Sequence, residues 1–442
     1  MRYPPGPRYR IRTSTLLYYR RDPLGMFTRL AREHGDIASV RLASYDLVLL
    51  SHPQHIRDAL VTNSRIFQKG PALKNTKIVL GEGLLTSEGE YHLRQRRLAQ
   101  PAFHRQRVAA YGEVMAAHAA RMRAAWREGI TLDISREMSR LTLGVVAETL
   151  FGSHMEREAD QVRKALTSAM GWFDLLLVPY AHMLLRLPLP ASRRFHRAHA
   201  HLDRVIYGLI EDARRREDRD CSDLLTMLLH SQEEGVGMTD AQLRDEALTI
   251  FLAGHETVAN ALTWTWYLLS QHPEVEMALH DELDTVLGGR LPTSSDVPSL
   301  PYTRMVLSES MRLYPPAWGV GRRAMEEYEV GGYRLPAGTV VVMSQWVTHR
   351  DPRWYPEPEK FDPARWTPEE EARRPRYSYF PFGGGPRQCI GEGFAWMEGV
   401  LLLATLAQQW KLRLAPAHKV ETQPLITLRP KYGMRMTLER RV

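Results

Sequence analysis

The stretch FGGGPRQCIG, residues 382–391, places Cys389 behind three glycines and directly before a helix-like run. Because glycine has no Cβ and reaches positive φ, this backbone can approach a flat cofactor closely and direct N–H groups at the sulfur. Arg387 adds a fixed fork of donors that suits a carboxylate. An amphipathic helix is predicted from Gly391 to about Trp410, and its dipole would hold the sulfur as a thiolate. The stretch therefore predicts a socket for a metal-bound thiolate.

A buried structural cysteine beside a glycine-rich turn is the alternative interpretation of these residues. It leaves the fixed offsets of Phe, Gly, Arg and Cys unexplained, since chance would produce them in such a chain on the order of once in ten thousand. The stretch resembles the haem-binding loop F-x-x-G-x-R-x-C-x-G of the cytochrome P-450 superfamily. The resemblance implies a haem b cofactor with Cys389 as the axial ligand of its iron. It also implies that Phe382, Gly383, Arg387 and Gly391 belong to the cofactor site.

The chain has 442 residues, of which 44% are hydrophobic and 25% charged, and this globular composition excludes a disordered or fibrous protein. Length alone suggests about two or three domains, but no Gly/Ser tract, proline-rich hinge or internal repeat divides the sequence. We therefore expect a single domain over residues 1–442. The expected fold class is mainly α with small β-sheets, as the resemblance to the cytochrome P-450 fold also implies.

Alternating apolar and polar residues predict a β-hairpin from Asp36 to Leu50, and a second strand-rich region is predicted from Leu425 to Leu438. Apolar residues recur at helical spacing through much of the chain between them. The clearest helical segments are Pro53–Thr62, Val108–Arg127, Arg136–Phe151, Phe195–Arg216, Asp240–Ser270 and Pro301–Leu313.

The longest predicted helix begins at the N-cap pair Thr239-Asp240 and meets no proline before Pro273. About thirty residues at about 1.5 Å each give a length of about 45 Å, which crosses a whole domain. At its middle the sequence AGHET, residues 253–257, places a glycine and a threonine where a buried helix prefers leucine. A packing glycine and a threonine that bonds back to its own helix are one interpretation.

These five residues are also similar to the [A/G]-G-x-[D/E]-T motif of the cytochrome P-450 superfamily. The resemblance implies that the small residues Ala253 and Gly254 leave room for dioxygen beside the haem. It further implies that the Thr257 hydroxyl hydrogen-bonds the dioxygen and that Glu256 relays protons to it. These four residues are the candidate catalytic residues.

Two further motifs resemble parts of the family that hold the cysteine loop and the haem. Glu309 and Arg312 lie one helical turn apart, and with Arg365 they resemble a buried Glu–Arg–Arg network that supports the loop. An exposed ion pair is the alternative interpretation of the first two residues. His92 and Arg96 match the family's W/H-x-x-x-R, which implies that they bind the haem propionates.

Arg322 stands where the family places another propionate donor, although its neighbour Arg323 leaves the register open. The positions that line the family's substrate pocket are nearly all apolar here, which predicts a lipid-like substrate such as a fatty acid, terpenoid or steroid. Each of these positions could equally belong to the core. The candidate pocket residues are Leu73, Leu84, Trp172, Phe173, Trp318 and Ile426.

The resemblance implies a haem-thiolate monooxygenase that inserts one oxygen atom of O2 into this apolar substrate by hydroxylation or epoxidation. The alternatives are a haem-thiolate peroxygenase or isomerase, which needs no external electrons, and a non-enzymatic haem-based gas sensor. The pair Glu256 and Thr257 favours the activation of dioxygen, since the peroxygenases usually lack such an acid–threonine pair.

No flavin or iron–sulfur segment is fused to the chain, so we expect a separate electron donor of the ferredoxin or flavodoxin type with its reductase. Arg94, Arg97, Arg105 and Arg107 would dock an acidic donor, and a merely solvated basic face is the alternative. The net charge of +8 also suggests nucleic acid as a partner. However, basic residues alternate with acids, as in residues 214–220, so we expect no nucleic-acid partner.

If Cys389 is a ligand, Cys221 has no disulfide partner, which fits a reducing compartment and predicts a cytoplasmic protein. Residues 1–7 lack the apolar segment of a signal peptide, and no run of about eighteen apolar residues predicts a transmembrane anchor. We expect a monomer of the soluble bacterial type, and a truncated chain is the alternative.

Overall fold

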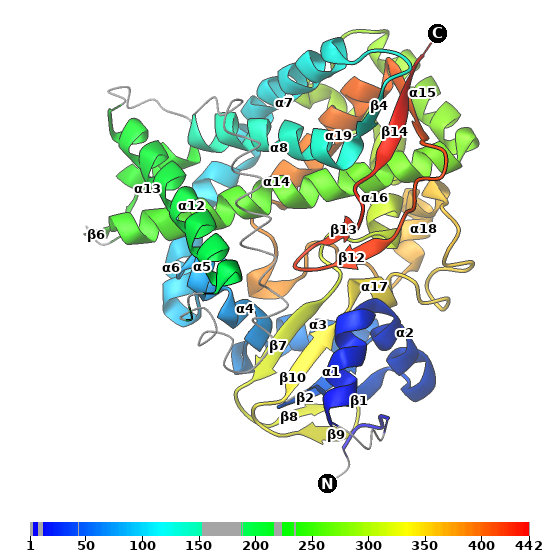
Figure 1. Cartoon of the computed structure of the whole chain (residues 1–442). Coiled ribbons are helices and arrows are strands. Elements are labelled where there is room, and N and C mark those ends of the chain that lie inside the picture. Colours follow the sequence, from blue (N-terminus) through cyan, green and yellow to red (C-terminus); the bar gives the residue numbers. More distant parts are fainter. Residues whose placement is uncertain are drawn as a thin grey trace.

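The computed structural model describes residues 3–7, 12–42, 44–152, 187, 189–215, 223–233 and 236–441 (Figure 1). The candidate pocket residues Trp172 and Phe173, and also Cys221, lie outside these described residues. Helices form most of the described chain, and short strands gather in small sheets. The expected fold class is therefore confirmed.

Most of the longer helices agree with the predicted segments to within a few residues, but α1, α2, α6 and α15 match no predicted segment. The described helices of ten or more residues are α1 (Arg12–Arg21), α2 (Pro23–His34), α6 (Gly89–Ala99), α7 (Arg105–Ala125), α8 (Ile134–Phe151), α12 (Pro190–Arg215), α14 (Asp240–Gln271), α15 (Pro273–Leu287), α16 (Pro301–Leu313) and α19 (Glu392–Ala407). Shorter helices are α3 (Pro53–Arg57), α4 (Pro71–Asn75), α5 (Lys77–Leu80), α13 (Leu224–His230), α17 (Gln345–Thr348) and α18 (Pro368–Arg373).

Capping groups explain where the central helix α14 starts and stops. The Thr239 side chain accepts the N–H of Gln242 at 3.3 Å, while the Gln242 side chain accepts the N–H of Thr239 at 2.8 Å. This reciprocal pair satisfies two of the free donors at the start of the helix. Pro273 cannot continue α14 but suits the first turn of a helix, so it opens α15 instead.

The main sheet has the strand order β1-β2-β10-β7-β3, in which only β10 and β2 are parallel neighbours. A three-stranded sheet has the order β11-β14-β4, and β12 and β13 form a separate antiparallel hairpin. The strands of these sheets are β1 (Ile37–Leu42), β2 (Tyr45–Leu50), β3 (Phe67–Lys69), β4 (Thr131–Asp133), β7 (Val320–Ala324), β10 (Val340–Met343), β11 (Trp410–Leu414), β12 (Thr422–Pro424), β13 (Leu428–Pro430) and β14 (Arg435–Arg440). Two short strand pairs complete the set, β5 (Gln232–Glu233) with β6 (Val236–Gly237) and β8 (Tyr328–Val330) with β9 (Tyr333–Leu335).

Both predicted strand regions contain strands, and one helix boundary was wrong. The hairpin expected from Asp36 to Leu50 is the pair β1–β2, and β13 and β14 lie in the region expected from Leu425 to Leu438. The helix expected to run to Trp410 ends at Ala407, and Trp410 instead begins β11.

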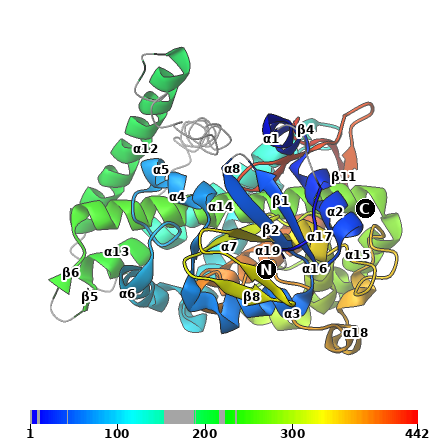
Figure 2. The same ribbon diagram turned by 90° about the horizontal axis from the view of Figure 1, so that it is seen from below.

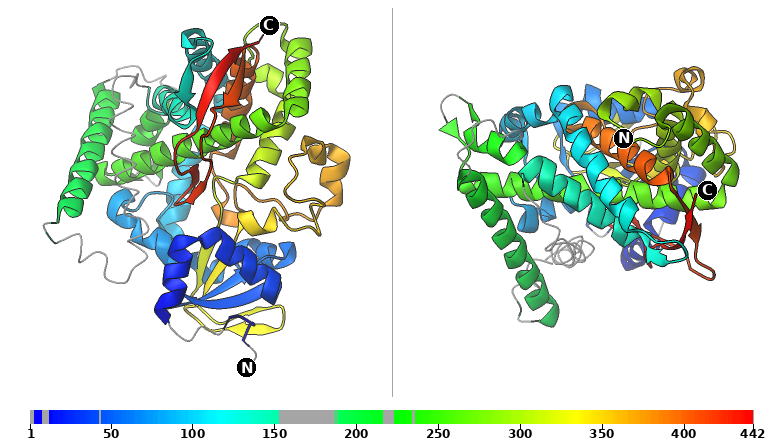
Figure 3. Two further views of the ribbon diagram at one scale, coloured as in Figure 1. Left: turned by 45° about the vertical axis from the view of Figure 1, so that its right-hand side comes forward. Right: turned by 90° about the horizontal axis from the view of Figure 1, so that it is seen from above.

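The strands and the helices occupy different parts of the molecule. The main sheet and the N-terminus lie at one end, while the C-terminus lies at the opposite end among helices (Figures 1 and 3). Seen from below, β1 and β2 face the viewer and α14 runs behind them across the whole body (Figure 2). The hairpin β12–β13 lies between the sheet end and α14, so it faces the middle of the long helix (Figure 1).

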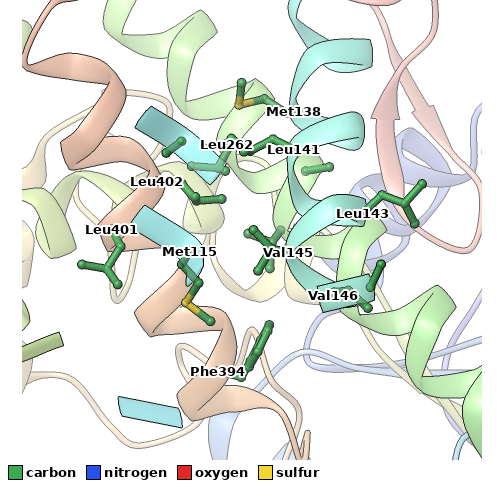
Figure 4. Packing of buried hydrophobic residues seen from close by; sticks show 14 of the residues in the cluster. Met115, Met138, Leu141, Leu143, Val145, Val146, Leu262, Phe394, Leu401 and Leu402 are labelled. Atoms are coloured by element: carbon green, nitrogen blue, oxygen red, sulfur yellow. The ribbon is translucent and has the colours of Figure 1, made fainter. Parts of the chain in front are cut away.

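Helices α7, α8, α14 and α19 meet in the largest core cluster (Figure 4). Met115 of α7, Val145 of α8, Leu262 of α14 and Leu402 of α19 are all fully buried there. Helix α14 packs on α8 along much of its length. This packing fixes the position of the middle of α14 in the molecule. Figure 4 also shows Phe394, five residues after Cys389, pointing into the same cluster.

Replacing Leu262 by Ala tests the role of this cluster. Leu262 has no exposed surface, so we expect the free energy of unfolding to fall by about 2–5 kcal/mol. Chemical unfolding followed by tryptophan fluorescence measures the loss. Leu17→Ala is the matched control, since this leucine is 67% exposed, and equal losses in both variants would contradict the prediction.

Candidate active site

The cysteine loop is closed by its own backbone. The Cys389 N–H donates to the Phe382 carbonyl at 3.0 Å, and Gly383 and Gly385 have φ values of +72° and +67°. A Cβ at Gly385 would lie 1.9 Å from the Leu60 carbonyl oxygen. The loop can therefore approach the backbone at Leu60 this closely only with glycine at position 385. The glycines therefore fix the direction in which the Cys389 side chain points from the backbone.

The expected thiolate is not a property of the metal-free chain. Burial raises the pKa of the Cys389 thiol to about 11, and the Gly391 N–H that points at the sulfur lowers it only in part. The carboxylate of Glu392, the first residue of α19, raises the pKa further. A bound metal ion would favour loss of the thiol proton.

The Cys389 side chain is exposed, although surrounding protein desolvates the sulfur. On α14, Ala253 is likewise exposed although Phe251, Leu252 and His255 beside it are buried. An exposed alanine in the middle of a buried helix, together with an exposed cysteine in the interior, marks space for a large group.

The AGHET segment of α14 shows both features of its structural interpretation. The Thr257 hydroxyl donates to the Ala253 carbonyl at 2.8 Å, and a Cβ on Gly254 would lie 3.0 Å from the Val146 side chain of α8. Gly254 therefore permits helix packing. The hydroxyl oxygen of Thr257 still has lone pairs that accept a hydrogen bond, so the back-bonded geometry is compatible with ligand binding.

Glu256 points toward the hairpin β12–β13. Its Oε1 accepts hydrogen bonds from the Thr427 hydroxyl at 2.5 Å and from Arg429 Nη2 at 2.6 Å. The Glu256 side chain is 13% exposed. Sequence reasoning did not find Thr427 or Arg429, because they lie about 170 residues from Glu256 and belong to no motif.

Cationic groups gather on the side of the site formed by β3, β7, α6 and the cysteine loop. His92 of α6 and Arg322 of β7 are buried, whereas Arg323 is exposed, so the structure turns Arg322 inward. Burial, with Arg387 next in effect, lowers the pKa of His92 to about 3 and the pKa of Arg322 to about 10. Arg96 donates to the Gln388 carbonyl at 2.8 Å.

Lys69, at the end of β3, joins this cluster although sequence reasoning missed it. Its Nζ donates to the carbonyls of Leu84 and Leu85, the former at 2.9 Å. Burial, followed by the charge of Arg387, lowers the pKa of Lys69 to about 6. A lone lysine in a three-residue strand carries no sequence signal, because only the tertiary fold brings β3 beside the cysteine loop.

The charges of this cluster suit a ligand with carboxylates. Glu88 takes part of the positive charge, since it pairs with Arg387, and it also accepts the backbone N–H of Lys69 at 2.6 Å. That leaves an excess of cations in a poorly solvated place, which favours binding of a further anion. His92 Nε2 is buried and has no hydrogen-bond partner within the described part of the chain. The residues present therefore fit a haem, which carries two propionates.

Glu309 of α16 is fully buried and receives four donors. Arg312 binds it with Nε and Nη2, both at 2.8 Å, and the indole N–H of Trp366 and the N–H of Asp362 add bonds of 2.9 and 3.0 Å. Arg365 Nε lies 3.4 Å from Glu309 Oε1. The structure thus brings together all three residues of the expected Glu–Arg–Arg network.

The network reaches the cysteine loop through His349. Arg312 Nη1 donates to the His349 carbonyl at 2.9 Å, and His349 Nε2 accepts the Phe380 N–H at 3.0 Å. Phe380 lies two residues before Phe382, where the loop begins. The ion pair in α16 and the loop that carries Cys389 are therefore parts of one hydrogen-bonded unit.

The expected pocket residues differ in their burial and in the elements that they contact. Leu84 is buried beside α14, where the Leu84 N–H donates to Glu246 at 2.9 Å, and Leu73 and Ile426 are partly buried. Trp318 packs against Phe27 of α2 in the core cluster beside the main sheet. Its indole N–H donates to the Leu425 carbonyl at 2.8 Å, next to Ile426, and its role as a pocket residue stays a prediction.

Replacing Arg312 by Met tests the buried network. The change leaves the Glu309 carboxylate buried without its main counter-charge, which costs about 3–5 kcal/mol of the free energy of unfolding. Arg140→Met is the control, because Arg140 pairs with Glu137 at the same spacing but is 52% exposed. Urea unfolding and haem content after purification measure the effect. Equal stability of the two variants would show that the buried pair does not support the fold.

No helix among the described residues is long and apolar enough to cross a bilayer. The sequence profile of the cytochrome P450 family matches residues 4–436. The chain is 42% identical over 412 residues to cyclooctatin synthase of Streptomyces melanosporofaciens, which covers 92% of this chain and 89% of that protein. It is 40% identical over 406 residues to cyclooctat-9-en-7-ol 5-monooxygenase of the same organism, covering 91% and 87%.

The structure of retinoic acid-bound cyanobacterial CYP120A1 is also similar, with a TM-score of 0.88, 27% identity and 99% coverage of both chains. The match extends over the cysteine loop, the middle of α14 and the Glu309 network alike. Haem b is the cofactor of this family, and its monooxygenases combine dioxygen, electrons from a redox partner and an apolar substrate. The chain belongs to the cytochrome P450 family and is a haem-dependent monooxygenase.

Proposed function

We propose that this monooxygenase hydroxylates or epoxidises a terpenoid, with Cys389 as the iron ligand and Glu256 and Thr257 as the proton route. The observations that carry the residue assignment are the exposure of Cys389 in the glycine loop and the exposure of Ala253 in the middle of an otherwise largely buried helix. The substrate class rests on cyclooctat-9-en-7-ol 5-monooxygenase, whose name describes oxidation of a terpenoid alcohol. Leu73, Leu84 and Ile426 are proposed to contact the substrate.

When bound, the haem supplies reductive activation of dioxygen and transfer of one oxygen atom to the substrate. In balance, substrate, O2, two electrons and two protons give the hydroxylated product and water. Cys389 Sγ would hold the iron, and Lys69, His92, Arg96, Arg322 and Arg387 would hold the propionates.

Glu256 and Thr257 are placed to move those protons. The Glu256 side chain is partly exposed and can exchange a proton with solvent. Thr257 lies next to it in the chain, one turn from Ala253, and its Oγ1 can accept a proton donor while it bonds to the Ala253 carbonyl. This acid–alcohol pair favours an oxygen-activating enzyme over a peroxygenase, an isomerase or a gas sensor.

We propose an acidic ferredoxin or flavodoxin as the electron donor. Arg105 and Arg107 are exposed at the start of α7, and Phe103 just before them packs 3.6 Å from the position of a Cβ on Gly391. The start of α7 therefore borders the loop that holds Cys389. A cationic face beside that loop would orient an anionic donor for electron transfer.

The other properties proposed for the chain rest on sequence. We propose a single domain over residues 1–442, a monomeric state and a cytoplasmic location. With Cys389 bound to iron, the second cysteine has no partner for a disulfide, which suits a reducing compartment.

Replacing Cys389 by Ser tests the ligand assignment. The dithionite-reduced protein under carbon monoxide should show the strongly red-shifted Soret band of thiolate-ligated haem, and the variant should lose that band because serine supplies no thiolate. Gly393→Ala, at a position with no neighbouring atom within 4 Å, is the control and should keep the band. Persistence of the band in the serine variant would remove Cys389 from the iron.

The double variant Arg105→Gln/Arg107→Gln tests donor docking. With an acidic ferredoxin as probe, its reduction rate should fall several-fold at low salt and approach that of the wild type near 1 M salt, where the screening length is about 3 Å. Arg20→Gln/Arg21→Gln in α1 removes the same charge elsewhere and should leave the rate unchanged. Rates that respond equally in both pairs, or that ignore salt, would contradict the proposal.

A further inference from the structure

Three successive turns of α14 bind the hairpin β12–β13. Glu256 accepts from Thr427 and Arg429, Asn260 Nδ2 lies 3.2 Å from Thr427 Oγ1, and Trp264 Nε1 donates to the Leu428 carbonyl at 3.0 Å. The three α14 residues are spaced by four, so they form one stripe on the helix. The hairpin is therefore held in register along the very segment that carries the AGHET motif.

Two further contacts fix the hairpin from its other side. The Leu428 N–H donates to the Pro316 carbonyl at 2.9 Å, and Trp318 Nε1 donates to the Leu425 carbonyl at 2.8 Å. The hairpin thus lies between α14 and the chain that follows α16. Because it is anchored on both sides, Thr427 and Arg429 present their donors to Glu256 without a large loss of entropy.

The contacts to Glu256 are unequal between its two oxygens. Thr427 and Arg429 both bind Oε1, and no hydrogen bond from the described residues reaches Oε2. A carboxylate held in this way cannot rotate freely, since rotation would exchange the two oxygens and break a charge-assisted bond. Oε2 is therefore the oxygen that remains for a proton.

We propose that Arg429 and Thr427 are positioning residues that hold Glu256 so that Oε2 can accept a proton from solvent and pass it toward Thr257. The inference rests on the proposed role of Glu256. Each proton that Oε2 gives up is replaced from solvent, so the carboxylate returns to its starting state. The hairpin tip, Leu425–Thr427, also carries Ile426, so a substrate that displaces Ile426 would alter the hold on Glu256.

Arg429→Gln, compared with Arg429→Lys, tests the ion pair. With a surrogate ferredoxin and reductase and no added substrate, NADPH oxidation in Arg429→Gln should slow about ten-fold and show a larger solvent isotope effect, because proton supply becomes limiting. Arg429→Lys restores a cation and should recover most of the rate. Lys431→Gln is the matched control, since Lys431 lies on the same segment but pairs with Glu421 at 3.0 Å.

A second measurement tests the same inference without turnover. In the ferrous protein with carbon monoxide as probe, the C–O stretching band should shift in Arg429→Gln and return in Arg429→Lys, since a carboxylate that changes its orientation would change the electric field at the bound probe. Thr427→Val and Thr427→Ser form a second pair, in which only valine lacks the hydroxyl. This pair decides the question if Arg429→Gln fails to fold.

The outcomes separate this inference from the proposed function. A wild-type protein without the thiolate Soret band or without dioxygen-dependent NADPH oxidation would overturn the proposed function itself. If the wild type has both, and Arg429→Gln and Thr427→Val match Lys431→Gln in rate, isotope effect and C–O band, the positioning role is refuted. Slower turnover with an unchanged isotope effect and band would likewise refute it, because it would reflect a structural role only.

Discussion

The buried carboxylate of Glu309 is the constraint on which the cysteine loop depends. A charge without solvent exposure is tolerable only if donors surround it, and Arg312 and Trp366 supply them from two directions. Those bonds hold together the segments that surround α16. His349 connects them to the start of the loop, because its Nε2 accepts the Phe380 N–H. The Glu309–Arg312 ion pair takes no part in the chemistry, but it helps to fix the position of the Cys389 sulfur.

Low solvation also affects the basic side chains on the side of the site that would hold the haem propionates. Lys69, His92 and Arg322 are buried there, and desolvation and Arg387 lower their pKa values, so the chain alone disfavours their charged forms. A ligand with two carboxylates would favour those charged forms and raise the pKa values again. Binding of the haem and protonation of these groups are therefore coupled.

The sequence predicted those features that depend on local order. Pro301–Leu313 was exact because proline marks its start, and α14 was found because its caps and its length are both written in the chain. The end of α19 was missed because Gln408 and Gln409 give no stop signal before β11. The family motifs found the residues near the haem, whereas Lys69 and Arg429 were missed because only the tertiary fold gives them a role.

The expected thiolate at Cys389 shows how local and tertiary effects compete. Helix position alone argued for a thiolate, but desolvation raises its pKa by more than the Gly391 N–H lowers it. An interior thiol that stays protonated resists oxidation and does not repel the neighbouring Glu392. It can become an anion when iron arrives to balance the charge. The socket is therefore shaped by the backbone before binding, while its charge is set by the metal.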